Sequence, residues 1–102
     1  MENETTRQQK VARQIQKDMA EIIRARGMAA YDGAMVTVSG VKISPDLAQA
    51  KVYVSIFPSA KAQDVMQQLQ DETPRLRGEL GRRVAKQLRI VPELSFYHSR
   101  MD

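Results

Sequence analysis

The stretch AKVYVSIF (residues 50–57) decides the fold class, because its apolar side chains recur at every second position. Positions 50, 52, 54 and 56 are apolar and positions 51, 53 and 55 are not, an alternation typical of a strand with one covered face and one open face. Tyr53 and Phe57 belong to the open face, where they could stack on nucleobases. Aromatic residues at such positions more often pair across strands or lie under a loop. The stretch therefore predicts a sheet that is covered on one side only.

The stretch AMVTVSGVKI (34–43) predicts a second strand just upstream. Val36 and Val38 alternate in one phase, whereas Val41 and Ile43 follow the other. A glycine at the change of phase, here in Ser39-Gly40, indicates a β-bulge. The connection SPDLAQ (44–49) contains turn-forming residues, and its proline cannot donate to a strand ladder, so the first strand is expected to end there.

Helical periodicity appears on both sides of these strands. Residues 5–26 carry apolar side chains at spacings of four, four, three and one, and Gly27 is expected to end this helix. A second helix is expected from Ser59, as its N-cap, to about residue 71 or 72. Thr73 and Pro74 form a cap residue followed by a first-turn proline, which predicts a break and then a third helix that stops at Pro92.

The stretch ELSFYH (93–98) completes the pattern as a last strand, with Leu94, Phe96 and His98 on one face. We therefore expect one domain over residues 1–102. Its predicted fold is α+β in two layers, in the order α-β-β-α-α-β, with three helices on one face of a three-stranded sheet.

A glycine pair lies within the predicted third helix. Residues 78–81 read G-E-L-G, and G-x-x-G is the loop with which KH domains clamp an RNA backbone. Such a clamp must lie between two helices, and a break at 78–81 would leave Pro74 inside a helix at a cost of about 3 kcal/mol. It would also take Leu80 out of a regular apolar stripe and set the carboxylate of Glu79 against a phosphate. We therefore predict that both glycines are helical, where each costs only about 1 kcal/mol relative to Ala.

Composition excludes several classes of protein. The chain has 102 residues and no Cys, so neither a disulfide framework nor a thiolate metal site can form. The start, MENETTRQQK, is polar and lacks the apolar core of a signal peptide, and no apolar run approaches the roughly 18–20 residues that span a bilayer. These features predict a soluble cytoplasmic protein without a membrane segment. The formal net charge is +4, and small domains this basic often bind nucleic acid.

Positive side chains form one line on the first predicted helix and one on the third, each away from the apolar stripe of its helix. For one helix alone, a solvated face is the simpler interpretation. Two such lines in one small domain favour binding to a polyanion. The eight residues predicted to bind RNA are Lys10, Arg13, Lys17, Arg24, Arg75, Arg82, Lys86 and Arg89.

Signals for catalysis are weak. The one histidine, His98, falls in a predicted strand, where such a residue is usually packed or half-exposed. Carboxylates occur singly or as Asp71-Glu72 at a helix end, and no phosphate-binding loop or metal-ligand spacing appears. We therefore predict no catalytic residue and no metal site. Membrane binding is disfavoured as well, because the basic helices need their apolar faces for the core.

Three stretches together resemble the ribosome-binding factor A family: VKISPDLAQAKVYVSIF (41–57), LGRRVAKQLRIVPELSF (80–96) and RQQKVARQIQKDMAEII (7–23). The chain departs from the family pattern at Glu72-Thr73-Pro74, where the family usually has an Ala-x-Gly kink between two helices. It also ends in HSRMD, where the family often continues with acidic residues.

The resemblance implies a type-II KH-like domain with a mixed sheet. It also implies binding to small-subunit (16S) rRNA during late maturation of the small ribosomal subunit, without enzymatic activity or a cofactor. The expected partners are the small ribosomal subunit and its rRNA, and the chain is expected to act as a monomer. The alternative is a protein-interaction module that binds ribosomal proteins or an assembly GTPase without direct RNA contact. Salt dependence separates the two, because RNA binding weakens steeply with salt.

Overall fold

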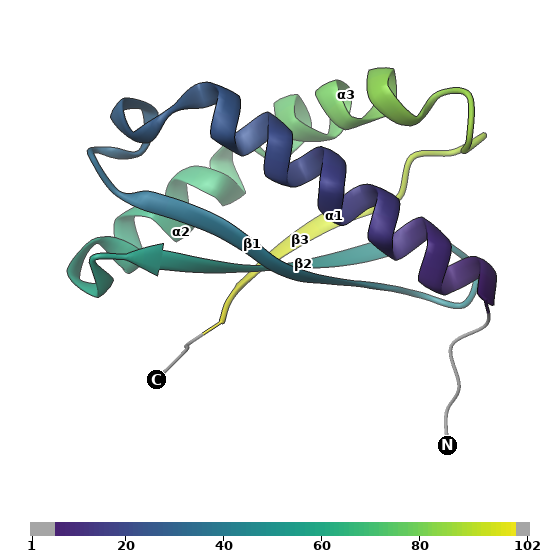
Figure 1. The fold of residues 1–102 in the computed structure, drawn as a ribbon, viewed down its shortest axis with the longest axis horizontal. Coiled ribbons are helices and arrows are strands. Elements are labelled where there is room, and N and C mark those ends of the chain that lie inside the picture. The colour runs from purple at the N-terminus through teal and green to yellow at the C-terminus, as the bar shows by residue number, and fades with distance from the viewer. Residues whose placement is uncertain (1–5, 100–102) are drawn as a thin grey trace.

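The computed structural model describes residues 6–99 and has the predicted element order, α-β-β-α-α-β (Figure 1). Two short 3₁₀ turns, η1 (Met28–Tyr31) and η2 (Ser59–Lys61), join neighbouring elements. The helices and strands are α1 (Thr6–Arg26), β1 (Met35–Ile43), β2 (Gln49–Phe57), α2 (Ala62–Asp71), α3 (Thr73–Val84) and β3 (Glu93–His98).

The sheet has the strand order β1-β2-β3 and is mixed. β1 and β2 are antiparallel and joined by a short turn, whereas β3 runs parallel to β2 because α2 and α3 carry the chain back across the sheet. Figure 1 shows the helices on one side of the sheet, and the other face is left open. The apolar face of β2 is fully buried beneath the helices, as its alternation predicts. The expected two-layer α+β fold is confirmed.

The β-bulge is where the change of phase predicts it. The register of β1 against β2 shifts between Val38 and Gly40, so that Val38 before the bulge and Ile43 after it are both buried on the helix side. The Ser39 hydroxyl donates to the carbonyl of Tyr53 across the pair at 3.1 Å. One extra residue therefore keeps both halves of β1 facing the core.

The Ser-Pro-Asp-Leu stretch builds the turn between β1 and β2. Asp46 Oδ1 accepts hydrogen bonds from the Ser44 hydroxyl at 2.6 Å and from the Ala48 amide at 3.0 Å. These two bonds hold the pKa of the Asp46 carboxyl below its usual value. Leu47 has a positive φ of 63°, which lets the chain reverse, and the Gln49 amide donates to Ser44 Oγ at 2.9 Å. Turn geometry thus explains the residues Ser44-Pro45-Asp46-Leu47.

The third helix is shorter than predicted: α3 ends at Val84 and does not continue to Pro92. The Arg77 guanidinium donates to the carbonyls of Val91 and Pro92, at 2.6 and 3.0 Å, and so holds the returning chain against α3. A helix continued to residue 91 would be about 10 Å longer and would carry Val91 away from Arg77. Leu88 is still buried, because the turn at 85–88 folds it onto the core.

Two predicted helix caps were wrong. Ser59 begins the 3₁₀ turn η2 and makes no capping hydrogen bond, and α2 starts three residues later at Ala62. Thr73 is the first residue of α3 rather than its N-cap. Its hydroxyl donates backwards to the carbonyl of Leu69 at 3.0 Å and satisfies an acceptor in the last turn of α2. The break between the helices lies at Glu72, next to the predicted Thr-Pro junction.

Candidate nucleic-acid interface

The eight cationic side chains predicted to bind RNA are all exposed. Within residues 6–99, none of them forms an ion pair with a carboxylate. The four on α1 share one line, because their positions differ by three, four and seven residues. Helix α1 thus presents a row of positive charge that no acid of the described chain neutralises.

Four other cations are used to hold the fold together. Arg26 pairs with Glu72 and Glu79 at 3.0 and 2.8 Å, and Lys61 pairs with Asp32 at 2.9 Å. Arg83 and Arg77 serve the same purpose: Arg83 lies 2.7 Å from the Glu21 carboxylate, and Arg77 binds backbone carbonyls. The structure therefore separates structural cations from free ones, and all eight predicted contacts fall in the free group.

The ion pairs also set the direction of the two basic helices. Arg26 of α1 pairs with Glu79 of α3, and Glu21 of α1 pairs with Arg83 of α3, so the two helices run antiparallel side by side. Glu79 was predicted to repel a phosphate, but Arg26 neutralises its carboxylate.

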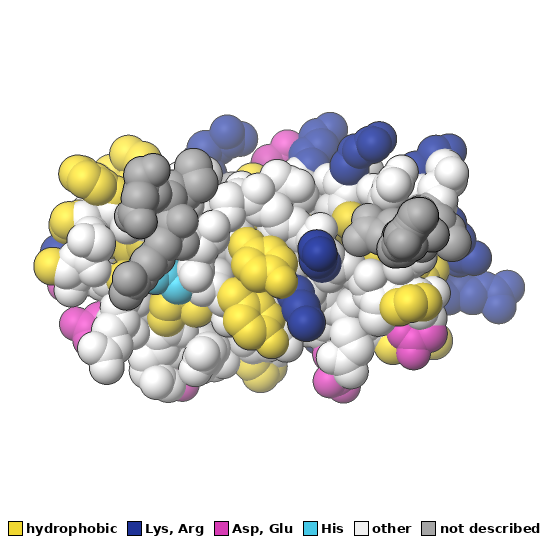
Figure 2. Space-filling view, turned by 90° about the horizontal axis from the view of Figure 1, so that it is seen from below, with side chains coloured by type: hydrophobic (Ala, Val, Ile, Leu, Met, Phe, Trp, Pro, Cys, Tyr) yellow, Lys and Arg dark blue, Asp and Glu magenta, His cyan; other side chains and the backbone are white. Residues whose placement is uncertain are grey.

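Only some of the cations predicted to line up on the third helix lie on α3. Arg75 and Arg82 lie on α3, seven residues apart and therefore on one side of the helix. Lys86 and Arg89 lie beyond its end, in the segment that returns to β3, so their predicted helical alignment was wrong. Figure 1 places the start of α1 and this returning segment at the same end of the molecule, and Figure 2 shows Lys and Arg side chains gathered at that end and along the adjoining edge.

The junction of α1 with α3 contains a buried phenol. Tyr31 is 1% exposed, and burial raises the pKa of its hydroxyl above the usual value, opposed by the nearby Arg26 charge. The phenol therefore stays neutral at physiological pH. Because it is buried, this group offers no reactive oxygen to solvent.

The glycine pair is helical, as predicted. Gly78 and Gly81 lie inside α3, and with Pro74, Arg77 and Val91 they line a shallow groove of about 360 Å³. A Cβ at Gly81 would come within 3.1 Å of Val91 Cγ2, so Gly81 is the position where α3 and the returning chain approach closely. The G-x-x-G sequence is therefore part of α3 and is no loop between helices, and its Gly81 allows the returning chain to pack closely.

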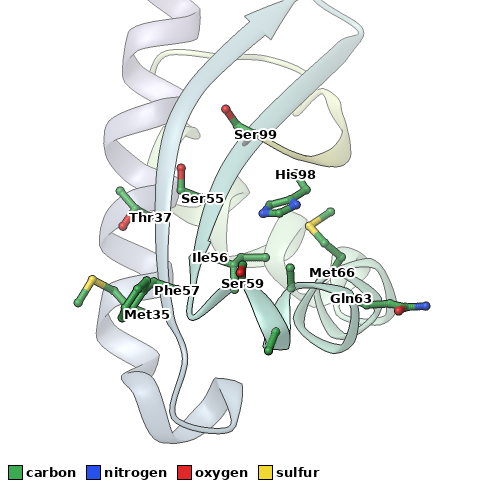
Figure 3. Close-up of a pocket in the computed structure, with 12 residues that line it drawn as sticks. Met35, Thr37, Ser55, Ile56, Phe57, Ser59, Gln63, Met66, His98 and Ser99 are labelled. Atoms are coloured by element: carbon green, nitrogen blue, oxygen red, sulfur yellow. The ribbon is translucent and has the colours of Figure 1, made fainter. Parts of the chain in front are cut away.

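A larger hollow of about 770 Å³ lies at the end of the sheet where β1 and β2 extend past β3 (Figure 3). His98, Ser55 and Met66 are among its lining residues, and its wall contains no carboxylate or cysteine. His98 therefore has no acidic partner there for general acid–base chemistry. Within residues 6–99, no group of three or more His, Cys, Asp or Glu side chains is placed to hold a metal ion.

Two residues on the open sheet face, Lys42 and Tyr97, were not identified from the sequence. Tyr97 pairs with Tyr53 across β2 and β3, and Lys42 lies directly opposite Lys51 across β1 and β2. Their alternation within each strand was visible in the sequence, but which strand lies beside which was not. Phe57, predicted for this face, is 71% exposed.

Comparison with known proteins is decisive. The sequence model of the ribosome-binding factor A family matches residues 7–101. The chain belongs to the ribosome-binding factor A family. Ribosome-binding factor A of Cytophaga hutchinsonii is 39% identical over 94 residues, which cover 92% of this chain and 71% of that protein. Its counterpart in Christiangramia forsetii is 38% identical, with coverage of 92% and 72%.

Solved structures of the ribosome-binding factor A family have the same fold. The crystal structure from Thermus thermophilus superposes with a TM-score of 0.76 at 27% identity, covering 89% of this chain and 94% of that one. A homology model of the Thermus protein, fitted into a cryo-EM map of a complex between the 30S subunit and ribosome-binding factor A, superposes at 0.68 with 29% identity, covering 83% and 87%. The predicted KH-like arrangement is thereby confirmed.

No described helix of this family member is long and apolar enough to cross a membrane.

Proposed function

We propose that this chain binds 16S rRNA in the small ribosomal subunit and assists the late maturation of that subunit. The observation that carries the proposal is the set of eight exposed cations without an internal partner. The Thermus member of the family has been fitted into a 30S complex, which supports the small subunit as the target. Phosphate contacts position such a protein, whereas the shape of the RNA selects the site.

The proposed mode of action is occupancy rather than chemistry. Free Lys and Arg side chains replace counterions around the phosphates, which supplies binding energy without a reacting group. The chain acts as a monomer in the cytoplasm. Contact with an assembly GTPase is compatible with this mode, because the open sheet face and the helix face point in different directions (Figure 1).

Co-sedimentation with purified small subunits tests the proposal. The parent protein should pellet with immature subunits more than with mature ones. A variant with Lys10→Ala, Arg13→Ala and Lys17→Ala should stay in the supernatant but keep its thermal stability, because all three side chains are exposed. Equal pelleting of parent and variant would overturn the proposed phosphate contacts, and an equal preference for mature subunits would overturn the late-maturation role.

A charge-matched control is available on the same helix. Arg7 is exposed on α1 but lies about a quarter turn away from the line of Lys10, Arg13 and Lys17. The single variant Arg7→Ala should therefore pellet almost like the parent, whereas Arg13→Ala should not.

A further inference from the structure

The open face of the sheet carries a pair of tyrosines at its centre. Tyr53 and Tyr97 are directly paired across β2 and β3, with ring centroids 5.6 Å apart and ring planes inclined at 31°. Tyr97 is 44% exposed, so its ring is available to a partner even though it contacts its neighbour. Figure 2 looks onto this face and shows hydrophobic side chains in the middle with Lys or Arg side chains directly beside them.

Two lysines adjoin the tyrosines in an arrangement that works against stability. Lys42 and Lys51 lie directly opposite each other across β1 and β2, and like charges in such positions repel. Lys51 Nζ lies 5.8 Å from the centre of the Tyr97 ring, within the range of a cation–π contact. In the described part of the open face, the strand pattern places one carboxylate, that of Glu93, at the start of β3. Neither lysine forms an ion pair with it.

Gly40 leaves open space in β1 opposite Tyr53. It is the partner of Tyr53 in β1, and a Cβ added there would meet no atom within 4 Å. The position beside Tyr53, which another residue would fill with a side chain, is therefore open space. A planar group could lie there against the tyrosine.

The hollow at the end of the sheet continues this surface. Ser55 follows Tyr53 by two residues on the same face of β2, about 7 Å further along the strand. With Thr37 and His98 it brings hydroxyl and imidazole groups to the wall of the hollow (Figure 3). These groups are donors and acceptors of the kind that bind base edges.

We propose that the open sheet face binds a single-stranded RNA segment, with bases stacked on Tyr53 and Tyr97 and phosphates held by Lys42 and Lys51. Aromatic rings next to uncompensated lysines match the alternation of bases and phosphates in single-stranded nucleic acid. A protein partner would have to match or desolvate two adjacent lysines at the centre of its contact. This inference rests on the proposed RNA-binding function and adds a second surface, facing away from the helices.

Tyr53 and Tyr97 form the proposed stacking surface, called here the platform. We test it by comparing binding to a twelve-nucleotide oligouridine with binding to an abasic ribose-phosphate chain of the same length. The double variant Tyr53→Leu with Tyr97→Leu should bind oligouridine about tenfold or more weakly, because stacking on each ring is lost. Its affinity for the abasic chain and its salt slope should not change, since no charge is removed. Tyr53→Phe with Tyr97→Phe should keep parental affinity, because phenylalanine still stacks.

A blocking variant tests the same site without removing an aromatic ring. Gly40 does not have the positive φ that would penalise a side chain, so Gly40→Thr should fold and fill the space beside Tyr53. It should weaken oligouridine binding and leave abasic binding unchanged. This variant also decides the matter if the double leucine variant fails to fold.

The outcomes separate this inference from the proposed function. If the leucine or threonine variants bind oligouridine like the parent while the α1 variant loses subunit binding, the platform is overturned and the proposed function stands. If the platform variants lose a ribosomal protein but not RNA, the face is a protein contact and the inference is wrong. If neither the α1 nor the platform variants alter RNA binding, both proposals fail.

Discussion

Gly78 and Gly81 occupy the same helix, yet their surroundings give them different roles. A Cβ at Gly78 would meet no atom within 4 Å, whereas one at Gly81 would press on Val91 at 3.1 Å. Gly78 therefore has no packing reason to be glycine in the described structure. Gly81 is required for the close approach of the chain that returns to β3.

Substitution of the two glycines should therefore have different effects on stability. Gly78→Ala should stabilise the protein by up to about 1 kcal/mol, because alanine is the better helix former. Gly81→Ala should gain less or lose stability, because Val91 must move. Urea denaturation of both variants checks this difference. A Gly78→Ala protein that is stable but no longer binds small subunits would contradict the helical interpretation and restore the RNA clamp.

Thr73 was predicted to cap the start of α3, but its hydroxyl serves the end of α2. Its hydroxyl satisfies the Leu69 carbonyl of α2 instead of an amide of α3. Thr73→Val, which keeps the shape and removes the hydroxyl, should cost about 0.5–1.5 kcal/mol. Thermal unfolding measures the loss. Serine at this position should retain most of the stability, and a valine variant as stable as the parent would show that the hydrogen bond contributes nothing.

The helix pair α2–α3 depends on contacts that no sequence period reveals. Arg26 reaches from the end of α1 to Glu72 at the junction and to Glu79 within α3, and its side chain is only 16% exposed. Arg77 likewise fixes where the chain turns back after α3. Together these two arginines connect α1 with α3 and with its junction to α2, and they hold the chain that leads into β3.

Loss of the Arg26 contacts should be costly. Arg26→Gln leaves two partly buried carboxylates without their cation and should destabilise the protein by about 1–3 kcal/mol. The control is Lys61→Gln, whose ion pair with Asp32 joins side chains that are 37% and 82% exposed, so that this pair should be worth about 0–1 kcal/mol. Equal losses of free energy of unfolding in urea would show that Arg26 does not hold the junction.

Much of the fold could be predicted because the spacing of apolar residues along the chain indicates which side chains are buried. The alternation in β2, the change of phase at Gly40 and the proline next to the helix break each describe one element, and each was confirmed. The end of α3 could not be predicted, because it depends on Arg77 and on carbonyls fourteen and fifteen residues away. The pairing of Tyr53 with Tyr97 was equally hidden, because it requires the parallel placement of β3 beside β2.

In the molecule as a whole, some charged side chains form ion pairs between helices, and other cations stay unpaired on the surface. Arginines at the seam of α1 and α3 are paired with the acids there, which leaves the exposed cations of α1, α3 and the returning segment without partners. The sequence identified these residues from their positions on the helices, and the structure explains why they remain available. Whether each one contacts a phosphate stays a prediction.

The most direct test of that prediction is the salt dependence of binding to small-subunit RNA. The triple variant Arg82→Ala, Lys86→Ala and Arg89→Ala should fold like the parent, bind more weakly, and show a slope of log affinity against log salt that is shallower by about one unit for each phosphate contact removed. The corresponding α1 variant, Lys10→Ala with Arg13→Ala and Lys17→Ala, should behave in the same way, and Arg7→Ala should leave the slope near the parental value. Parental affinity and slope in both triple variants would contradict the account, because the free cations would then be no more than a solvated face.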